Sequence, residues 1–164
     1  MTRRSLSAAC AATAVIWGGA TFAEISPADI VWEDEIAIPA SLSGTPGDPV
    51  AGAVTVSSRS AGNCLSCHQN TAMPEHDFQG NIGPSLDGSG ARWSEAELRG
   101  IVVNAKRVFP ESMMPVFYND NPEDYIRPGE AYTARAYNPE TFSTLLTAQQ
   151  VEDVVAYLMT LTDW

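Results

Sequence analysis

The chain has 164 residues, with 9 lysines and arginines against 20 aspartates and glutamates and a formal net charge of −11. This length suits one domain with an extension and excludes a multidomain machine, while the acidic balance argues against a protein that binds nucleic acid or an anionic membrane through bulk electrostatics. Hydrophobic residues make up 45% of the chain, enough for a packed core, and 11 prolines with 12 glycines indicate a backbone rich in loops.

The N-terminus has the pattern of an export signal. Arg3-Arg4 give a short positive start, an apolar run follows from Leu6 to Ala20, and Thr21-Phe22-Ala23 offers small residues to a signal peptidase. We therefore expect residues 1–23 to be a signal peptide that directs the chain to the periplasm, with Glu24 as the first mature residue. Paired arginines could also indicate the twin-arginine route, but the residues around them match it poorly.

Residues 24–47 form an N-terminal extension ahead of the expected domain. They are too apolar for an inert tail and too irregular for a helix, with hydrophobic side chains scattered among acids: Ile25, Ile30, Val31, Trp32, Ile36 and Ile38. We hypothesise that this arm packs on a partner subunit. The alternative is that it wraps the domain's own core.

A first helix is predicted after the extension. Asp48-Pro49 is typical of a helix cap followed by proline at the first helical position. One face then carries Val50, Ala53, Val54 and Ser57. The pattern predicts a helix that runs to about Ala61 and delivers the chain to Cys64. Gly52 in this helix would allow close approach by a large side chain such as Tyr157.

The segment Asn63-Cys64-Leu65-Ser66-Cys67-His68 contains C-x-x-C-H, the attachment motif of a c-type haem. Cys10 lies in the signal peptide, so Cys64 and Cys67 are the cysteines of the mature chain. Two thiols three positions apart can reach the two vinyl groups of one porphyrin edge, and His68 is then held under the iron as an axial ligand. We predict one covalently bound haem c.

Two other uses of the motif have to be weighed against haem. One is a redox C-x-x-C of thioredoxin type followed by a chance histidine, which would lie in a βαβ pattern, whereas the flanks here indicate helix and loop. The other is half of a zinc site. Zinc needs about four ligands, and His76 is the one further nitrogen or sulfur donor of the usual kind outside the motif.

Between His68 and the next helix lies a turn-dense segment, residues 80–88. Pro84 has no N–H, so a carbonyl near it can accept a hydrogen bond from the second ring nitrogen of His68, which would fix the tautomer and raise the basicity of the ligand. We predict this supporting role for Pro84; the alternative is an ordinary surface turn. Arg92 and Trp93 could donate to the haem propionates, or could be a solvated charge and a core aromatic.

A second helix is predicted over residues 95–107. Ser94 with Glu97 forms a capping-box pattern, and the helix ends before Pro110. Its apolar stripe consists of Leu98, Ile101, Val102 and Ala105.

The second axial ligand of a low-spin electron-transfer haem is usually Met or His. Met73 and His76 follow His68 so closely that their loop would have to round the porphyrin edge on little chain, about 17 Å at full extension for Met73. We expect both at the surface or on the pocket wall. Met159 falls in a helical pattern and is expected in the core.

Met113 and Met114 remain, in the segment Ser112-Met113-Met114-Pro115-Val116-Phe117. A proline directly after a methionine biases that methionine away from helical geometry and stiffens the loop. Such a loop can present a thioether at a fixed distance. We choose Met114 as the ligand and keep Met113 as the alternative.

The chain ends with a long loop and a last helix. Residues 118–143 are rich in tyrosine and proline, and such long connections often carry interfaces, although this one could also shield the haem edge. Thr147 with Gln150 forms another capping box, which predicts a helix near 148–161. Its apolar face consists of Val151, Val154, Val155 and Leu158.

In order along the chain, C-x-x-C-H, Gly83-Pro84-x-Leu86, a helix and Met114-Pro115-x-Phe117 before a terminal helix resemble class I cytochromes c. This resemblance implies an all-α fold over residues 48–164, with a few helices around one covalently attached haem. More narrowly, the segments Gly47–Pro49, Gly62–His68, Gly80–Leu86 and Met113–Tyr118 are similar to SoxX, the monohaem subunit of the SoxAX cytochromes of sulfur oxidation.

The SoxX resemblance implies a periplasmic heterodimer with SoxA, which couples thiosulfate oxidatively to a cysteine of the carrier protein SoxYZ as an L-cysteine S-thiosulfotransferase. In that family the sulfur chemistry is assigned to the SoxA haem and its cysteine ligand, and SoxX passes electrons to a downstream acceptor cytochrome. The mature chain agrees, because it has no third cysteine to act as a nucleophile, and an iron with both axial positions filled has no open site. We expect no catalytic residue and no membrane anchor in this chain.

Two other functions remain as alternatives. The chain could be a freestanding electron carrier between a dehydrogenase and a terminal oxidase. It could also be a haem protein whose weak methionine ligand leaves, so that the iron opens to small ligands or peroxide.

Overall fold

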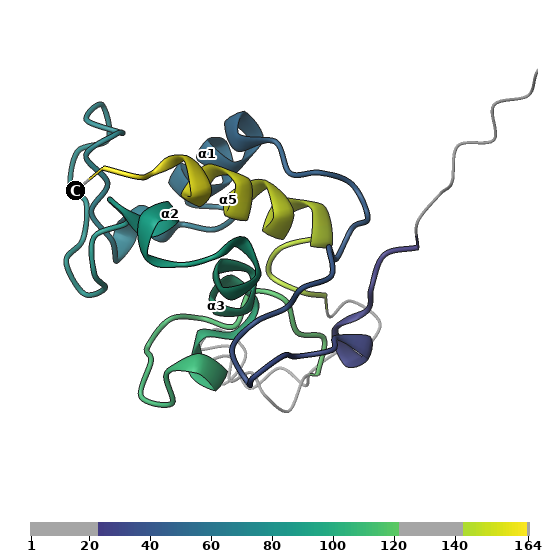
Figure 1. Cartoon of the computed structure of the whole chain (residues 1–164). Coiled ribbons are helices and arrows are strands. Elements are labelled where there is room, and N and C mark those ends of the chain that lie inside the picture. Colours follow the sequence, from purple (N-terminus) through teal and green to yellow (C-terminus); the bar gives the residue numbers. More distant parts are fainter. Residues whose placement is uncertain (1–22, 122–142, 164) are drawn as a thin grey trace, which may run out of the picture.

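The computed structural model describes residues 23–121 and 143–163, and within these residues its regular secondary structure is helical. Two 3₁₀ turns and four α-helices follow one another as η1 (Pro27–Asp29), α1 (Pro49–Ser57), η2 (Cys64–Ser66), α2 (Ser89–Arg92), α3 (Glu95–Val108) and α5 (Ala148–Thr160). Figure 1 shows α1 packed beside α5, with α3 beneath them. None of the helices in the described ranges has the length and apolar character to cross a membrane. The expected all-α architecture is confirmed.

Helix α1 begins as predicted and ends early. The Asp48 carboxylate accepts a hydrogen bond from the Val50 N–H at 2.8 Å, and proline occupies the first helical position. The helix stops at Ser57, about one turn before the expected end at Ala61. The reason is that Ser58 leaves helical geometry for extended backbone with ψ of 121°.

The buried face of α1 also differs from the expected stripe. Val50 and Val54 are 72% and 63% exposed. A Cβ on Gly52 would lie 1.9 Å from the carbonyl oxygen of Asp153 and 2.8 Å from the Cβ of Tyr157, so the bare backbone of α1 rests directly on α5. The expected close approach of Tyr157 to Gly52 is confirmed, and this contact turns the valines outward. The buried residues of α1 are Gly52, Thr55 and Val56.

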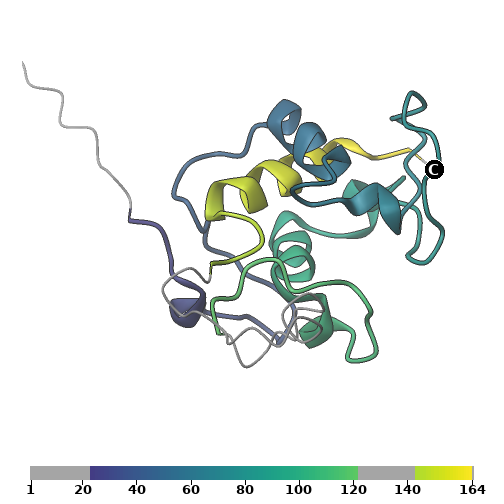
Figure 2. The same ribbon diagram turned by 180° about the vertical axis from the view of Figure 1, so that it is seen from behind.

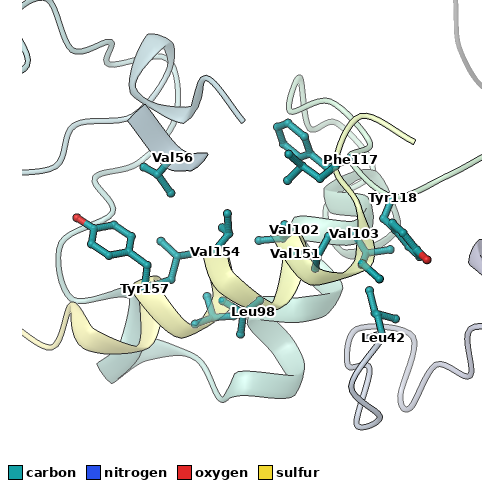
Figure 3. Close-up of a cluster of buried hydrophobic side chains, with 14 of the residues drawn as sticks. Leu42, Val56, Leu98, Val102, Val103, Phe117, Tyr118, Val151, Val154 and Tyr157 are labelled. Carbon is teal, nitrogen blue, oxygen red and sulfur yellow. The ribbon is translucent and has the colours of Figure 1, made fainter. Parts of the chain in front are cut away.

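Helices α3 and α5 form the centre of the core. Both predicted capping boxes are present, Ser94 with Glu97 and Thr147 with Gln150. Figure 3 shows side chains of α5 meeting those of α3 and α1, with Leu42 and the segment after α3 at the margin. The labelled members of this cluster are Leu42, Val56, Leu98, Val102, Val103, Phe117, Tyr118, Val151, Val154 and Tyr157. Each of these side chains is buried, so these helices enclose a common apolar interior.

The N-terminal extension packs on the domain's own core. Ile38 and Leu42 are 1% and 0% exposed. The Ile25 N–H donates to the Leu42 carbonyl at 2.8 Å, and the Ile38 N–H donates to the Ala96 carbonyl at 2.9 Å. Of the two alternatives for this arm, the structure supports the wrapped core, and the partner hypothesis is wrong for these buried residues. Val31, at 76% exposed, still faces outward.

A buried ion pair ties the extension to the helices. Arg99, 2% exposed, donates from Nε and Nη2 to the two carboxylate oxygens of Glu152, 4% exposed, at 2.9 Å each. Another guanidinium nitrogen donates to the Ile38 carbonyl at 2.7 Å, and the Leu42 N–H donates to the Glu152 carboxylate at 2.7 Å. Charged side chains are rarely buried unless they are paired. The sequence pattern does not indicate this pair, because Arg99 and Glu152 are 53 positions apart.

Tyr118, the first residue of the expected long loop, is buried in the core. It is 3% exposed, and its single hydroxyl proton is shared between the Ile25 carbonyl oxygen at 2.7 Å and a Glu24 carboxylate oxygen at 3.0 Å. Burial is the main cause that raises the pKa of Tyr118, and the hydrogen bond to the Glu24 carboxylate raises it further. Tyr118 still lies between α3 and α5 outside any helix, as the expected loop requires, and the central part of that loop, residues 122–142, lies outside the described residues.

Candidate haem site

The C-x-x-C-H motif is wound into a single helical turn. Asn63 has positive φ (51°) and turns the chain into η2, and its side-chain oxygen accepts a hydrogen bond from the Ser66 hydroxyl at 2.7 Å. The N–H groups of Cys67 and His68 both donate to the Cys64 carbonyl at 3.0 Å. Residues three and four apart in such a turn lie on one side. The two thiols and the imidazole are therefore carried by one short, closed piece of backbone.

The environment of the thiols disfavours a redox pair. Cys64 and Cys67 are free in the structure. Burial raises the pKa of the Cys64 thiol to about 11, whereas a reactive C-x-x-C works through a thiolate with a lowered pKa. Across residues 23–121 and 143–163, His, Cys, Asp and Glu side chains form no group of three that could hold a metal ion, so the structure adds nothing to the zinc alternative.

Residues 80–86 run alongside the motif and are hydrogen bonded to it. The N–H groups of Gly80, Gly83 and Leu86 donate to carbonyls of Leu65, Cys67 and Gln69, each at 2.8 Å. A Cβ on Gly80 would lie 2.1 Å from the Ser66 carbonyl oxygen. The two segments can be this close only because glycine stands at the point of contact.

The imidazole of His68 is held between Gly83 and Pro84. A Cβ on Gly83 would lie 2.3 Å from Cε1 of His68, so the ring rests against bare backbone. Nδ1 of His68 lies 2.6 Å from the Pro84 carbonyl oxygen. A carbonyl oxygen only accepts, so Nδ1 carries the proton and Nε2 is left with its lone pair for a metal.

The two candidate methionines after α3 differ in burial. Met113 is 81% exposed, whereas Met114 is half-buried and packs against the core cluster. The loop around them is fixed by the Lys106 ammonium, which donates to the Ser112 carbonyl at 2.7 Å, and by the Met114 N–H, which donates to the Ser112 hydroxyl at 3.2 Å. Figures 1 and 2 show this loop (green) and the loops of residues 58–87 (blue to teal) on the same side of the molecule, away from the start of the extension (purple).

The other sulfur and nitrogen donors lie elsewhere. Met73 is 5% exposed and belongs to the core cluster, so it is not at the surface. His76 is half-buried, with Nε2 3.5 Å from the Glu75 carboxylate. Met159 packs against the core, as expected.

The cytochrome c family model matches residues 57–162. The chain belongs to the cytochrome c family. It is similar, with 44% sequence identity and a TM-score of 0.77, to a chain of the crystal structure of SoxXA from P. pantotrophus, and the match covers 86% of this chain and 100% of that one. Within the family the chain is therefore of the SoxX type. No curated protein sequence matches it significantly.

This cytochrome carries one covalently bound haem c and acts in electron transfer. The residues present fit that group. Cys64 and Cys67 offer two free thiols on one turn. Nδ1 of His68 is hydrogen bonded to the Pro84 carbonyl, and the imidazole ring occupies space that a Cβ at Gly83 would fill.

Two residues that sequence reasoning considered for the propionates are engaged elsewhere in the structure. The Arg92 guanidinium donates to the carbonyls of Asp87 at 2.8 Å and Ser85 at 3.0 Å. Trp93 is half-buried and meets Phe109 edge to face, with ring centroids 6.1 Å apart, which agrees with the core-aromatic alternative.

The sequence did not reveal the hydrogen bonds among Asn70, Gln79 and Tyr157, which join the haem-binding loop to α5. Asn70 is 1% exposed, and its amide nitrogen donates to the Tyr157 hydroxyl at 2.6 Å. The Gln79 side chain accepts from the Asn70 N–H at 2.6 Å and donates to the Met73 carbonyl at 2.8 Å. An asparagine two residues after the histidine and a lone glutamine in a polar loop carry no periodic signal that could have identified them.

Proposed function

We propose that the chain is the electron-accepting subunit of a periplasmic SoxAX-type complex, which couples thiosulfate oxidatively to a cysteine of a SoxYZ-type carrier protein. The observation that carries the proposal is the 44% identity to a chain of SoxXA from P. pantotrophus over the whole of that chain. Within the complex, SoxA would carry the sulfur chemistry. This chain would pass electrons on to a downstream cytochrome.

The site residues have distinct roles in this proposal. Cys64 and Cys67 would bind the haem covalently, and His68 and Met114 would hold its iron as axial ligands. The bound haem would supply one-electron chemistry. The rigid Met114 loop keeps a neutral thioether in place, and such a ligand raises the reduction potential, which suits an electron acceptor. The Pro84 carbonyl holds the Nδ1 proton of His68 and fixes its tautomer.

The proposal also assigns the ends of the chain. Residues 1–23 are a signal peptide, 24–47 an extension, and 48–164 the cytochrome domain. Hydrogen bonds support this start of the mature chain, because Glu24 and Ile25 directly after the cleavage site are bound to the Tyr118 hydroxyl. Mass analysis of the exported protein tests it: the expected product begins at Glu24 and carries the mass of one haem.

Co-purification tests the partner assignment. The tagged chain, expressed with its signal peptide in its own host, is isolated from the periplasm and its companions are identified by haem stain and mass analysis. A second c-type cytochrome in equal amount, with thiosulfate-dependent modification of a SoxYZ-type carrier, is the expected result. A stable monomer that exchanges electrons with many partners would instead support a freestanding carrier. Rapid carbon monoxide binding by the ferrous form would support a labile methionine ligand.

A further inference from the structure

Arg92 lies where it can control the hydrogen-bond acceptor of the axial histidine. Its Nη1 donates to the Asp87 carbonyl at 2.8 Å and its Nη2 to the Ser85 carbonyl at 3.0 Å. Ser85 directly follows Pro84, whose carbonyl receives the Nδ1 proton of His68 at 2.6 Å. The Arg92 guanidinium is therefore hydrogen bonded to the backbone immediately after the Pro84 carbonyl.

The position of Arg92 is itself fixed. It is the last residue of α2, and α2 is anchored to the end of α5 by two hydrogen bonds. The Ser89 hydroxyl donates to the Leu158 carbonyl at 2.9 Å, and the Gly90 N–H donates to the Leu161 carbonyl at 3.0 Å. The guanidinium thus connects the acceptor loop to the helical core.

The backbone around Pro84 needs such a connection. Before it, the Gly83 N–H donates to the Cys67 carbonyl, and after it, the Leu86 N–H donates to the Gln69 carbonyl. Pro84 has no N–H of its own, so it cannot donate a backbone hydrogen bond that would anchor the stretch between Gly83 and Leu86. The planar guanidinium of Arg92 binds two carbonyls of this loop at once. It therefore restricts the loop backbone more than the single ammonium group of a lysine could.

We propose that Arg92 is a positioning residue for His68, which acts by aiming the Pro84 carbonyl at Nδ1. The inference rests on the proposed role of His68 as an axial ligand. A strong Nδ1–H···O bond makes the imidazole more basic and favours the ferric iron, so it lowers the reduction potential. If Arg92 acted instead through its charge, on a propionate or on the iron, its effect would have the opposite sign, since a nearby cation favours the ferrous form.

The opposite signs make the proposal testable with Arg92→Lys, which keeps the charge and loses the two-pronged hydrogen bonding. In the complete haem-loaded protein, this variant is expected to show a higher reduction potential. A change in the ferric-to-ferrous ratio on the order of tenfold is expected, which corresponds to about 59 mV for a one-electron couple. The Nδ1 proton of His68, followed by NMR, is expected to exchange faster with solvent. Arg59→Met, which removes an exposed charge five residues before Cys64, should not raise the potential and should leave the exchange of the Nδ1 proton unchanged.

A second variant separates the two effects further. Arg92→Met removes both the two-pronged hydrogen bonding and the charge. The reduction potential of this variant should therefore lie below that of Arg92→Lys, while the Nδ1 proton of His68 should exchange as fast in both variants. An unchanged or lower potential in Arg92→Lys, with slow proton exchange, would overturn the positioning role. The proposed ligand role of His68 is checked separately in the wild-type protein, where the Nδ1 proton must show the large shift of a group bound to paramagnetic iron.

Discussion

Replacing Gly83 with alanine tests the geometry on the histidine side of the haem site. A Cβ at this position would lie 2.3 Å from Cε1 and 2.6 Å from Nδ1 of His68, whereas ordinary contacts begin near 3.4 Å. The ring and the loop must therefore separate by about 1 Å, because the added methyl group would occupy the space of the ring itself. The 2.6 Å hydrogen bond to the Pro84 carbonyl would then stretch past the limit of about 3.2 Å.

The expected cost combines overpacking with the lost hydrogen bond, about 2–4 kcal/mol in the free energy of unfolding. Denaturant unfolding of the haem-loaded protein, followed by circular dichroism, measures it. The reduction potential should rise at the same time. Gly47→Ala is the matched control, since its Cβ would lie 2.1 Å from the Glu152 carbonyl oxygen, outside the haem-binding loops, and should reduce stability alone. A Gly83→Ala protein with wild-type potential and stability within about 0.5 kcal/mol would refute the reasoning.

Three further predictions concern the other face of the haem and the core. Met114→Ala should abolish the long-wavelength sulfur-to-iron charge-transfer band of the ferric spectrum and Met113→Ala should keep it; the reverse would transfer the ligand role to Met113. Arg99→Leu should cost about 3–5 kcal/mol, because it leaves the buried Glu152 carboxylate without its cation. Breaking the exposed ion pair between Arg107 and Glu35 (2.8 Å) with Glu35→Gln should cost about 1 kcal/mol or less, and equal losses in denaturant titration would contradict this. The raised pKa of Tyr118 means that its protonated hydroxyl stabilises the fold up to the ordinary value of 10.0, and that this contribution is lost as pH rises further. Tyr118→Phe should lose about 1 kcal/mol near neutral pH and should lack that part of the alkaline decline, as pH-dependent unfolding would show.

The parts of the fold that sequence predicted best are those set by local chemistry. The two capping boxes, at Ser94 and Thr147, place the starts of α3 and α5 at Glu95 and Ala148. The C-x-x-C-H motif is equally local, since one turn of backbone carries both thiols and the imidazole. In each case the interacting groups are three or four residues apart, and their spacing alone is sufficient to predict the contact.

The interpretation failed where a contact between distant segments outweighed local pattern. Val50 and Val54 have helical spacing and still face outward, because Gly52 brings the backbone of α1 against α5. Arg99 would ordinarily be assigned to a solvated face, yet it is buried against Glu152, a residue 53 positions away. Neither outcome is encoded in the residues adjacent to it, so periodicity could not have predicted it.

The haem site combines both kinds of information, because its candidate ligands and the Pro84 acceptor could be predicted from the sequence, whereas the close packing that positions them could not. Ligands are chosen by chemical type, and few cysteines, histidines and methionines compete for the role. Their support comes from close approach of residues 80–86 to residues 65–69, which depends on Gly80 and Gly83 having no side chain. A glycine adds nothing to a hydrophobic or charge pattern in the sequence. The missing side chain of Gly83 nevertheless decides where the imidazole of His68 lies. Substitutions in this glycine-bearing segment should therefore change the electronic properties of the site more than substitutions of most of the bulky residues around it.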